Sequence, residues 1–170
     1  MTAALRVIGW TAVAVGTVWN GSRSAPVPVE ASSPDVHVIS GLAAVPGDHA
    51  PRFDLLRPID ATSPAPVLIA VHGGSWTGGS RRDYAPQFLP LAERGIAVAV
   101  VDYRPARPGS PSWDGALRDV LAVVDWVDRR GREHGLDARR IAVLGTSAGG
   151  LLAARAGQSD PRVRAIVGLS

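Results

Sequence analysis

The sequence contains no cysteine and no lysine. The absence of cysteine excludes disulfide bonds and thiolate metal ligands, and it is compatible with either side of a bacterial membrane. Because lysine is absent, all 18 residues of the Lys/Arg class are arginines, and 15 acidic residues oppose them. The net charge of +3 is small, and the arginines are scattered among Asp and Glu. This pattern predicts a solvated surface of mixed charge and no nucleic-acid-binding patch.

Long apolar runs are scarce, and the one that stands out lies at the N-terminus. Residues 7–19 are uncharged and mostly apolar, and they lead into small polar residues with a candidate cleavage site at residues 22–24. The run is shorter than the roughly 20 residues of a membrane span and is typical of a secretory signal peptide. We therefore expect residues 1–25 to be a signal peptide or, if uncleaved, a membrane anchor. This favours an extracytoplasmic location over a cytoplasmic one; an N-terminal arm or a misplaced start codon is the alternative.

The rest of the chain predicts a linker followed by one domain. Residues 26–35 are rich in Pro, Ser and Ala, which indicates a linker, and the domain is expected over residues 36–170. In the domain, β-prone apolar runs alternate with helical patterns, which predicts a mostly parallel sheet with helices on both faces. The expected strands are 36–40, 52–56, 67–71, 96–101, 141–144 and 165–169, and the expected helices are 83–94, 112–130 and 147–156.

Residues 145–149, Gly-Thr-Ser-Ala-Gly, match the pattern Gly-x-Ser-x-Gly. The pattern directly follows a predicted strand and opens a predicted helix, which is where a nucleophilic serine stands on a sharp strand-to-helix turn. We therefore predict that Ser147 is a catalytic nucleophile. The backbone N–H of Ala148 is then expected to donate to the oxyanion of a tetrahedral intermediate. The alternative is a serine that only caps a helix after a glycine turn.

A second motif, His72-Gly73-Gly74, follows the predicted strand at residues 67–71. Glycines let the backbone of such a loop approach a substrate, so this loop is the expected second source of oxyanion donors. His72 precedes the serine in the chain, and we expect it to hold its own loop by hydrogen bonds and not to act as the general base. Residues 102–104, Asp-Tyr-Arg, follow the next predicted strand and are expected to brace a loop.

Together these three motifs resemble the α/β-hydrolase superfamily, and within it the His-Gly-Gly esterases and lipases of the hormone-sensitive-lipase-like and feruloyl-esterase-like branches. The resemblance covers about residues 52–170. It implies an α/β-hydrolase fold and the hydrolysis of small-molecule carboxyl esters through an acyl-enzyme on Ser147, without a cofactor or a metal. It also implies that the oxyanion donors are Gly73, Gly74 and Ala148.

The sequence departs from this family in two respects. Ser75 stands where many relatives have a third glycine, which weakens the placement in the lipase-like branch. In this fold the triad acid and histidine follow the serine, but after Ser147 the sequence has only one acid, Asp160, and no histidine. Asp160 is expected to be a turn residue and His134 to lie in an exposed loop. We therefore expect a C-terminally incomplete α/β-hydrolase domain whose triad acid and histidine lie beyond residue 170.

Two other functions stay open at this point. An amidase, formamidase or peptidase can use the same scaffold, because the residues seen so far do not define the acyl pocket. A non-catalytic, truncated homologue is the other alternative. The 170-residue chain alone is expected to be inactive, since a nucleophile without its base loses most of its rate acceleration. The sequence carries no signal for acyl or alcohol specificity or for oligomeric state.

Overall fold

The computed structural model describes residue 33 and residues 35–59, 63–107 and 113–170. The expected signal peptide or anchor at residues 1–25 and most of the expected linker at residues 26–35 lie outside the described residues. Among the residues that are described, no helix has both the length and the apolar character needed to cross a bilayer.

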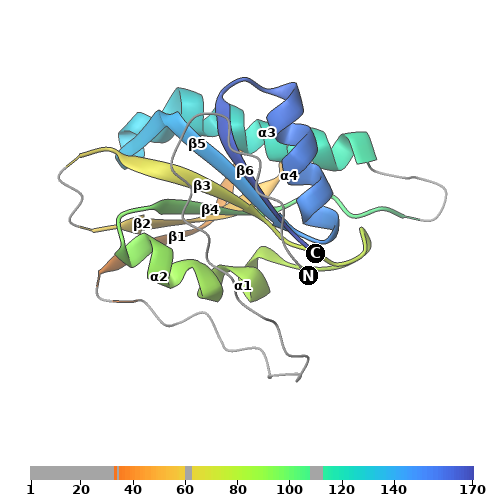
Figure 1. Cartoon of the computed structure of the whole chain (residues 1–170), viewed down its shortest axis with the longest axis horizontal. Coiled ribbons are helices and arrows are strands. Elements are labelled where there is room, and N and C mark those ends of the chain that lie inside the picture. The colour runs from red at the N-terminus through yellow and green to blue at the C-terminus, as the bar shows by residue number, and fades with distance from the viewer. Residues whose placement is uncertain (1–32, 34, 60–62, 108–112) are drawn as a thin grey trace.

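A single six-stranded sheet forms the centre of the described chain (Figure 1). Its strands are β1 (Val36–Ala43), β2 (Arg52–Pro58), β3 (Ala65–Val71), β4 (Ala97–Asp102), β5 (Leu136–Thr146) and β6 (Val163–Leu169). They lie in the order β1-β2-β4-β3-β5-β6. The last four of these strands are mutually parallel, whereas β2 runs antiparallel to both of its neighbours. The predicted mostly parallel sheet is therefore confirmed.

Helices cover both faces of this sheet (Figure 1). One face carries the short helices α1 and α2, and the opposite face carries the longer helices α3 and α4. The helical segments are α1 (Arg81–Tyr84), the 3-10 helix η1 (Ala85–Phe88), α2 (Leu89–Glu93), α3 (Trp113–Arg130), the 3-10 helix η2 (Gly131–His134) and α4 (Ala148–Ser159).

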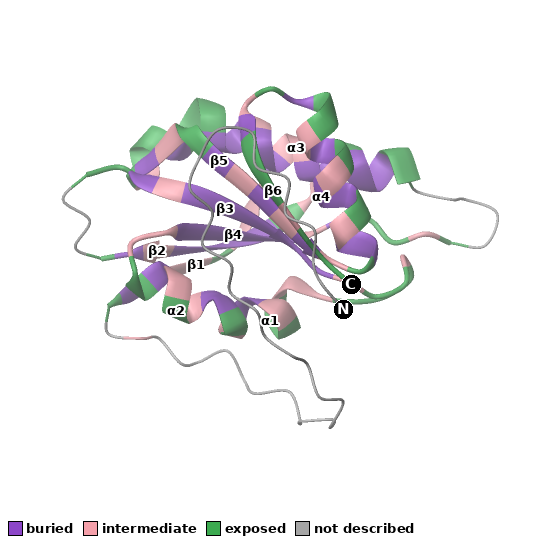
Figure 2. Cartoon of the chain, viewed as in Figure 1, coloured by how far each residue is buried: buried purple, intermediate pink, exposed green. Residues whose placement is uncertain are grey.

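The central strands are buried on both faces because successive side chains of a strand point to opposite sides. In β3, Val67, Ile69 and Val71 belong to the cluster that packs against α3, whereas Leu68 and Ala70 belong to the cluster beneath α2. Figure 2 shows the resulting purple band of buried residues through the middle of the sheet. A continuous apolar run thus serves two cores at once.

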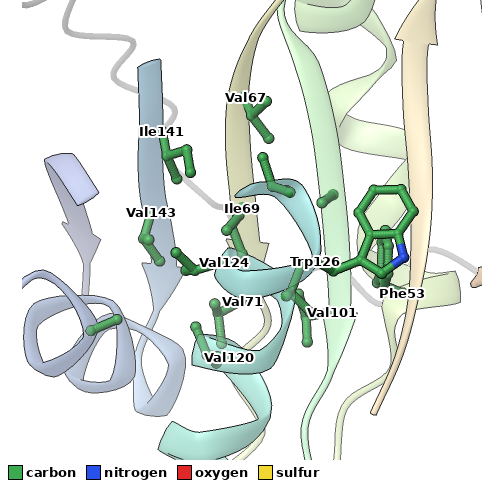
Figure 3. Packing of buried hydrophobic residues seen from close by; sticks show 14 of the residues in the cluster. Phe53, Val67, Ile69, Val71, Val101, Val120, Val124, Trp126, Ile141 and Val143 are labelled. Carbon is green, nitrogen blue, oxygen red and sulfur yellow. The ribbon is translucent and has the colours of Figure 1, made fainter. Parts of the chain in front are cut away.

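The larger core extends from the centre of the sheet to β2 (Figure 3). There the ring of Trp126 from α3 meets the ring of Phe53 edge-on, with the centroids 4.9 Å apart. Edge-to-face pairs of this kind contribute about 0.5–1.5 kcal/mol beyond the area that they bury. The pair fixes α3 against the antiparallel side of the sheet.

Two predicted helices differ from the observed ones, and β5 begins five residues before the strand predicted at 141–144. The helix expected at 83–94 is wrong: the segment is broken into α1, η1 and α2, and Pro86 and Pro90 stand in the first turns of η1 and α2. Proline has no N–H to donate, so it starts a new helical segment and cannot continue the previous one. The helix expected to end at residue 156 continues to Ser159, and Gly157 lies within it, where an added Cβ would be 2.2 Å from the Ile166 side chain.

Candidate active site

The three predicted motifs meet at one edge of the sheet. His72 follows β3, Asp102 ends β4, and Ser147 follows β5. These three strands are neighbours in the order β4-β3-β5 and run parallel to one another. The carboxyl ends of parallel strands meet at the same edge of a sheet, which is where α/β proteins place their ligands. Residues that are far apart in the chain therefore lie next to one another.

Ser147 occupies a strained backbone conformation between β5 and α4. Its φ is 52° and its ψ is −118°, which are rare values for a residue with a side chain. Its N–H donates a 2.7 Å hydrogen bond to the carbonyl of Leu169 in β6, which helps to hold the turn in place. Although Ser147 is the N-cap residue, its side chain makes no capping hydrogen bond to α4, whose residues are all described. The geometry therefore differs from that of a serine that only caps a helix.

The two glycines of the Gly-x-Ser-x-Gly pattern let backbone approach backbone. A Cβ on Gly145 would lie 2.0 Å from the Gly149 carbonyl oxygen, and a Cβ on Gly149 would lie 2.2 Å from the Val71 carbonyl oxygen. Both contacts are far shorter than atoms tolerate, so only glycine fits. The turn that carries Ser147 is therefore packed directly against the end of β3.

The glycine loop after β3 lies against this turn. A Cβ on Gly73 would be 3.3 Å from the Cβ of Ser147 and 3.0 Å from the Thr146 carbonyl oxygen. Gly74 has a φ of +130°, and a side chain there would meet the Gly78 carbonyl at 2.3 Å. The structure thus brings the predicted oxyanion loop into contact with the predicted nucleophile.

His72 is buried and holds its own loop. Its ring stacks on the ring of Tyr103 at a centroid distance of 4.5 Å, and its Nδ1 donates to the Gly73 carbonyl at 2.7 Å. The Tyr103 hydroxyl in turn donates to the His72 carbonyl at 3.2 Å. The second ring nitrogen, Nε2, lies 3.7 Å from the Asp102 carboxylate. These contacts match the bracing roles expected for His72 and for the Asp-Tyr-Arg motif.

Sequence reasoning missed Arg81, which joins two carboxylates beneath the loop. Its backbone N–H donates to Asp102 at 2.6 Å, its guanidinium also contacts Asp102, and its Nε donates to Asp54 at 2.9 Å. Asp54 also accepts the Gly41 N–H at 2.7 Å. Burial alone lowers the pKa of Arg81, but the hydrogen bonds to Asp54 and Asp102 outweigh it, so its pKa is raised. Asp54 itself is buried in β2, which only the structure reveals.

Arg104 completes the Asp-Tyr-Arg motif by binding α3. Its Nε and Nη2 donate to Asp119 at 2.8 and 2.7 Å, and its backbone N–H donates to the same carboxylate at 2.8 Å. Asp119 is only 3% exposed. This paired set of bonds fixes the segment after β4 to α3.

Asp160 and His134 both lie away from Ser147, at the opposite ends of α4 and β5. Asp160 is bound by Arg162 in the turn before β6, as expected of a turn residue. The expectation that His134 lies in an exposed loop is wrong. It belongs to η2, it is half-buried, and its ring lies 5.0 Å from that of Trp126. Burial lowers the pKa of His134.

Residues 53–164 match the model of the BD-FAE family, which is two thirds of the chain. The chain belongs to the BD-FAE family. Esterase LipC of Mycobacterium tuberculosis (strain ATCC 25618 / H37Rv) is 39% identical to this family member over 122 residues, which are 69% of this chain and 30% of LipC. Probable carboxylic ester hydrolase LipM of the same organism is 37% identical over 107 residues, 61% of this chain and 24% of LipM. The matched part of the chain therefore spans 24–30% of the length of these relatives.

Solved structures show the same fold as this BD-FAE family member. Bacterial Heroin Esterase is similar with a TM-score of 0.63 and 32% identity, over 74% of this chain and 40% of that one. Esterase B from Lactobacillus rhamnosis (HN001) is similar with a TM-score of 0.65 and 27% identity, over 72% of this chain and 39% of that one. These likenesses confirm the predicted α/β-hydrolase fold and the resemblance to esterases of the His-Gly-Gly type.

Proposed function

We propose that the protein to which this chain belongs is a serine carboxylesterase with Ser147 as its nucleophile. The observation that carries this proposal is the strained Ser147 turn with the Gly73 backbone packed against it. Enzymes store backbone strain where a side chain must be presented to a substrate, and a helix cap has no use for it. The similar proteins named above are esterases, which favours esters over amides and peptides.

The reaction follows from where the groups lie. The Ser147 hydroxyl oxygen attacks the acyl carbonyl carbon, a base takes the hydroxyl proton, and the carbonyl oxygen becomes an oxyanion. Backbone N–H groups of Ala148, Gly73 and Gly74 are the proposed donors to that oxyanion. The N-terminus of α4 starts at Ala148, so its positive end adds to the stabilisation. The C–O bond to the alcohol then breaks as the protonated base gives its proton to the leaving oxygen. Water, losing a proton to the same base, attacks the acyl-enzyme, and the acid leaves as Ser147 regains its proton.

We infer that none of the four histidines of this sequence is the base. His134 lies at the opposite end of β5 from Ser147, and His72 is held by its own loop. His37 in β1 and His49 between β1 and β2 are separated from β5 by β4 and β3. We propose that a histidine and an acid that follow residue 170 complete the triad. This agrees with the Ser, acid, His order of the fold.

The test is Ser147→Ala in the native polypeptide that contains this chain. Hydrolysis of short-chain p-nitrophenyl esters is expected to fall by at least roughly 1,000-fold, because nucleophile, base and orienting acid act as a unit. A fluorophosphonate probe is expected to label the parent protein stoichiometrically and to leave the variant unlabelled. Ser159→Ala, at the exposed far end of the same helix, is the matched control and keeps both properties.

Full esterase activity in the Ser147→Ala variant contradicts the proposal. The same preparations are assayed with formamides and blocked peptides. If the parent protein cleaves those substrates and not esters, Ser147 remains the proposed nucleophile. The proposed activity is then that of an amidase or peptidase and not that of an esterase.

A further inference from the structure

We propose that Tyr84 is a positioning residue that fixes the Ser147 turn through Thr146. The hydroxyl of Tyr84 lies 2.6 Å from Oγ1 of Thr146, the residue that directly precedes Ser147. Both groups are hydroxyls, so either of them can donate. This inference rests on the proposed function, since it assigns Tyr84 a part in presenting the same nucleophile.

The helix that carries Tyr84 is fastened at both of its ends. At its start, the backbone N–H of Arg81 donates to Asp102 at the end of β4. At its last residue, Tyr84 bonds to Thr146 at the end of β5. The strand between β4 and β5 is β3, so α1 spans the end of the strand from which the His72-Gly73-Gly74 loop leaves.

These two bonds, together with the contacts of the Arg81 guanidinium with Asp54 and Asp102, position α1. The helix has four residues, none of them buried, and a 3-10 segment follows it directly. A single helical turn has almost no stability of its own. The ring of Tyr84 packs edge-on against Phe88 at a centroid distance of 4.9 Å, which holds the ring but not the turn of Ser147. The hydroxyl connects α1 to that turn through Thr146.

Thr146 transmits the position of Tyr84 to both halves of the site. Its carbonyl oxygen lies 3.0 Å from where a Cβ on Gly73 would be, and its peptide bond leads into the strained Ser147. Helices α1 and α4 lie on opposite faces of the sheet (Figure 1), so the turn is held between them. A shift of Thr146 therefore changes the gap between the Ser147 hydroxyl and the oxyanion loop.

The Tyr84 hydroxyl also keeps its proton under ordinary conditions. Burial raises the pKa of Tyr84, and the hydrogen bond with Thr146 only partly offsets this. The phenol therefore stays neutral across the pH range in which esterases are assayed, and the contact with Thr146 persists.

The experiment compares Tyr84→Phe, Thr146→Val and the double variant in the native polypeptide. Tyr84→Phe keeps the ring against Phe88 and removes only the hydroxyl. We expect kcat per active site, counted by fluorophosphonate titration, to fall about tenfold while KM stays within twofold, because misplacement by a fraction of an ångström lowers the rate of the chemical step. Thr146→Val is expected to give the same loss, and the double variant no further loss, since both remove one bond.

Leu91→Ala in α2 is the control for packing. Leu91 packs against the same apolar cluster as Phe88 but stands seven residues beyond Tyr84, so the melting temperature is expected to fall while kcat per titrated site is unchanged. A Tyr84→Phe variant with the parent's kcat per titrated site overturns the inference. So does a double variant whose loss of kcat equals the product of the Tyr84→Phe and Thr146→Val losses. If Ser147→Ala stays active, the proposed function itself fails; if Ser147 is essential and Tyr84→Phe is fully active, only the role of Tyr84 fails.

Discussion

Gly149→Ala is expected to damage stability and catalysis together. A Cβ at this position would lie 2.2 Å from the Val71 carbonyl oxygen and 2.6 Å from the His72 carbonyl oxygen. Real Cβ atoms essentially never come closer than 3.0 Å, so the first turn of α4 and the end of β3 must separate by roughly 0.8 Å, the difference between 2.2 and 3.0 Å. Neither carbonyl can rotate away, because both belong to backbone.

The size of the effect comes from two opposed contributions. Overpacking costs about 1–3 kcal/mol and occasionally more, and two backbone contacts place Gly149 at the upper end of that range. Alanine recovers up to about 1 kcal/mol through its better helix propensity. A net loss of about 2 kcal/mol in the free energy of unfolding lowers the melting temperature by about 4–8 °C in a folding unit of 150–250 residues. Because the displaced atoms separate Ser147 from the oxyanion loop, kcat is expected to fall about 100-fold.

The assay is thermal and urea unfolding of the native polypeptide followed by circular dichroism, with ester hydrolysis measured on the same samples. Gly150→Ala is the matched control one residue further along α4. Its Cβ would lie 3.2 Å from the Gly145 carbonyl oxygen and 3.4 Å from that of Leu169, contacts that a shift of a few tenths of an ångström relieves. It is expected to stay within about 1 kcal/mol of the parent. A Gly149→Ala variant as stable and active as Gly150→Ala refutes the reasoning.

Two further changes test the electrostatic contacts. Arg104→Met is expected to lower the free energy of unfolding by about 3 kcal/mol, since it leaves the buried Asp119 carboxylate without the Arg104 guanidinium. Urea unfolding measures this loss, and adding Asp119→Asn to the Arg104→Met variant should recover part of it. Asp160→Asn tests pH dependence. The side-chain hydrogen bond from Arg162 lowers the pKa of Asp160 below its ordinary 3.8, so its stabilisation is complete above that pH and is lost as pH falls through the lower folded-state value. The variant should therefore be less stable than the parent at pH 7, and the difference should shrink below about pH 4; a constant difference contradicts the assignment.

The parts of the site that the sequence predicted are those that sit at strand ends. A continuous run of apolar, β-prone residues predicts a buried strand of a parallel sheet. The residue that follows such a strand lies at the carboxyl edge of the sheet. For this reason His72, Asp102 and Ser147 were each predicted to follow a strand, and the observed order β4-β3-β5 shows that they share one edge. The glycines around them followed from the same logic, because backbone that must approach backbone has no space for a Cβ.

The missed parts depend on which side chains meet across the fold. Nothing distinguishes Arg81 from the other arginines, because its partners Asp54 and Asp102 stand on different strands and become neighbours only when β2 pairs with β4. His134 became half-buried because α3 places Trp126 beside it. The broken helix after residue 80 is a different case: the two prolines were visible, and their power to divide a helix outweighs the apolar spacing.

The pairing of β3 with β5 also has a consequence for the growing polypeptide. Gly73 and Ser147 are 74 positions apart in the chain, so at about 5–20 residues per second the ribosome makes the glycine loop roughly 4–15 s before the serine. Parallel pairings of such long separation are slow to form, because the intervening chain must first be ordered. Until β5 docks, nothing holds Ser147 in its costly backbone conformation. Ser147, the proposed nucleophile, is therefore held in its strained conformation only after β5 has joined the sheet.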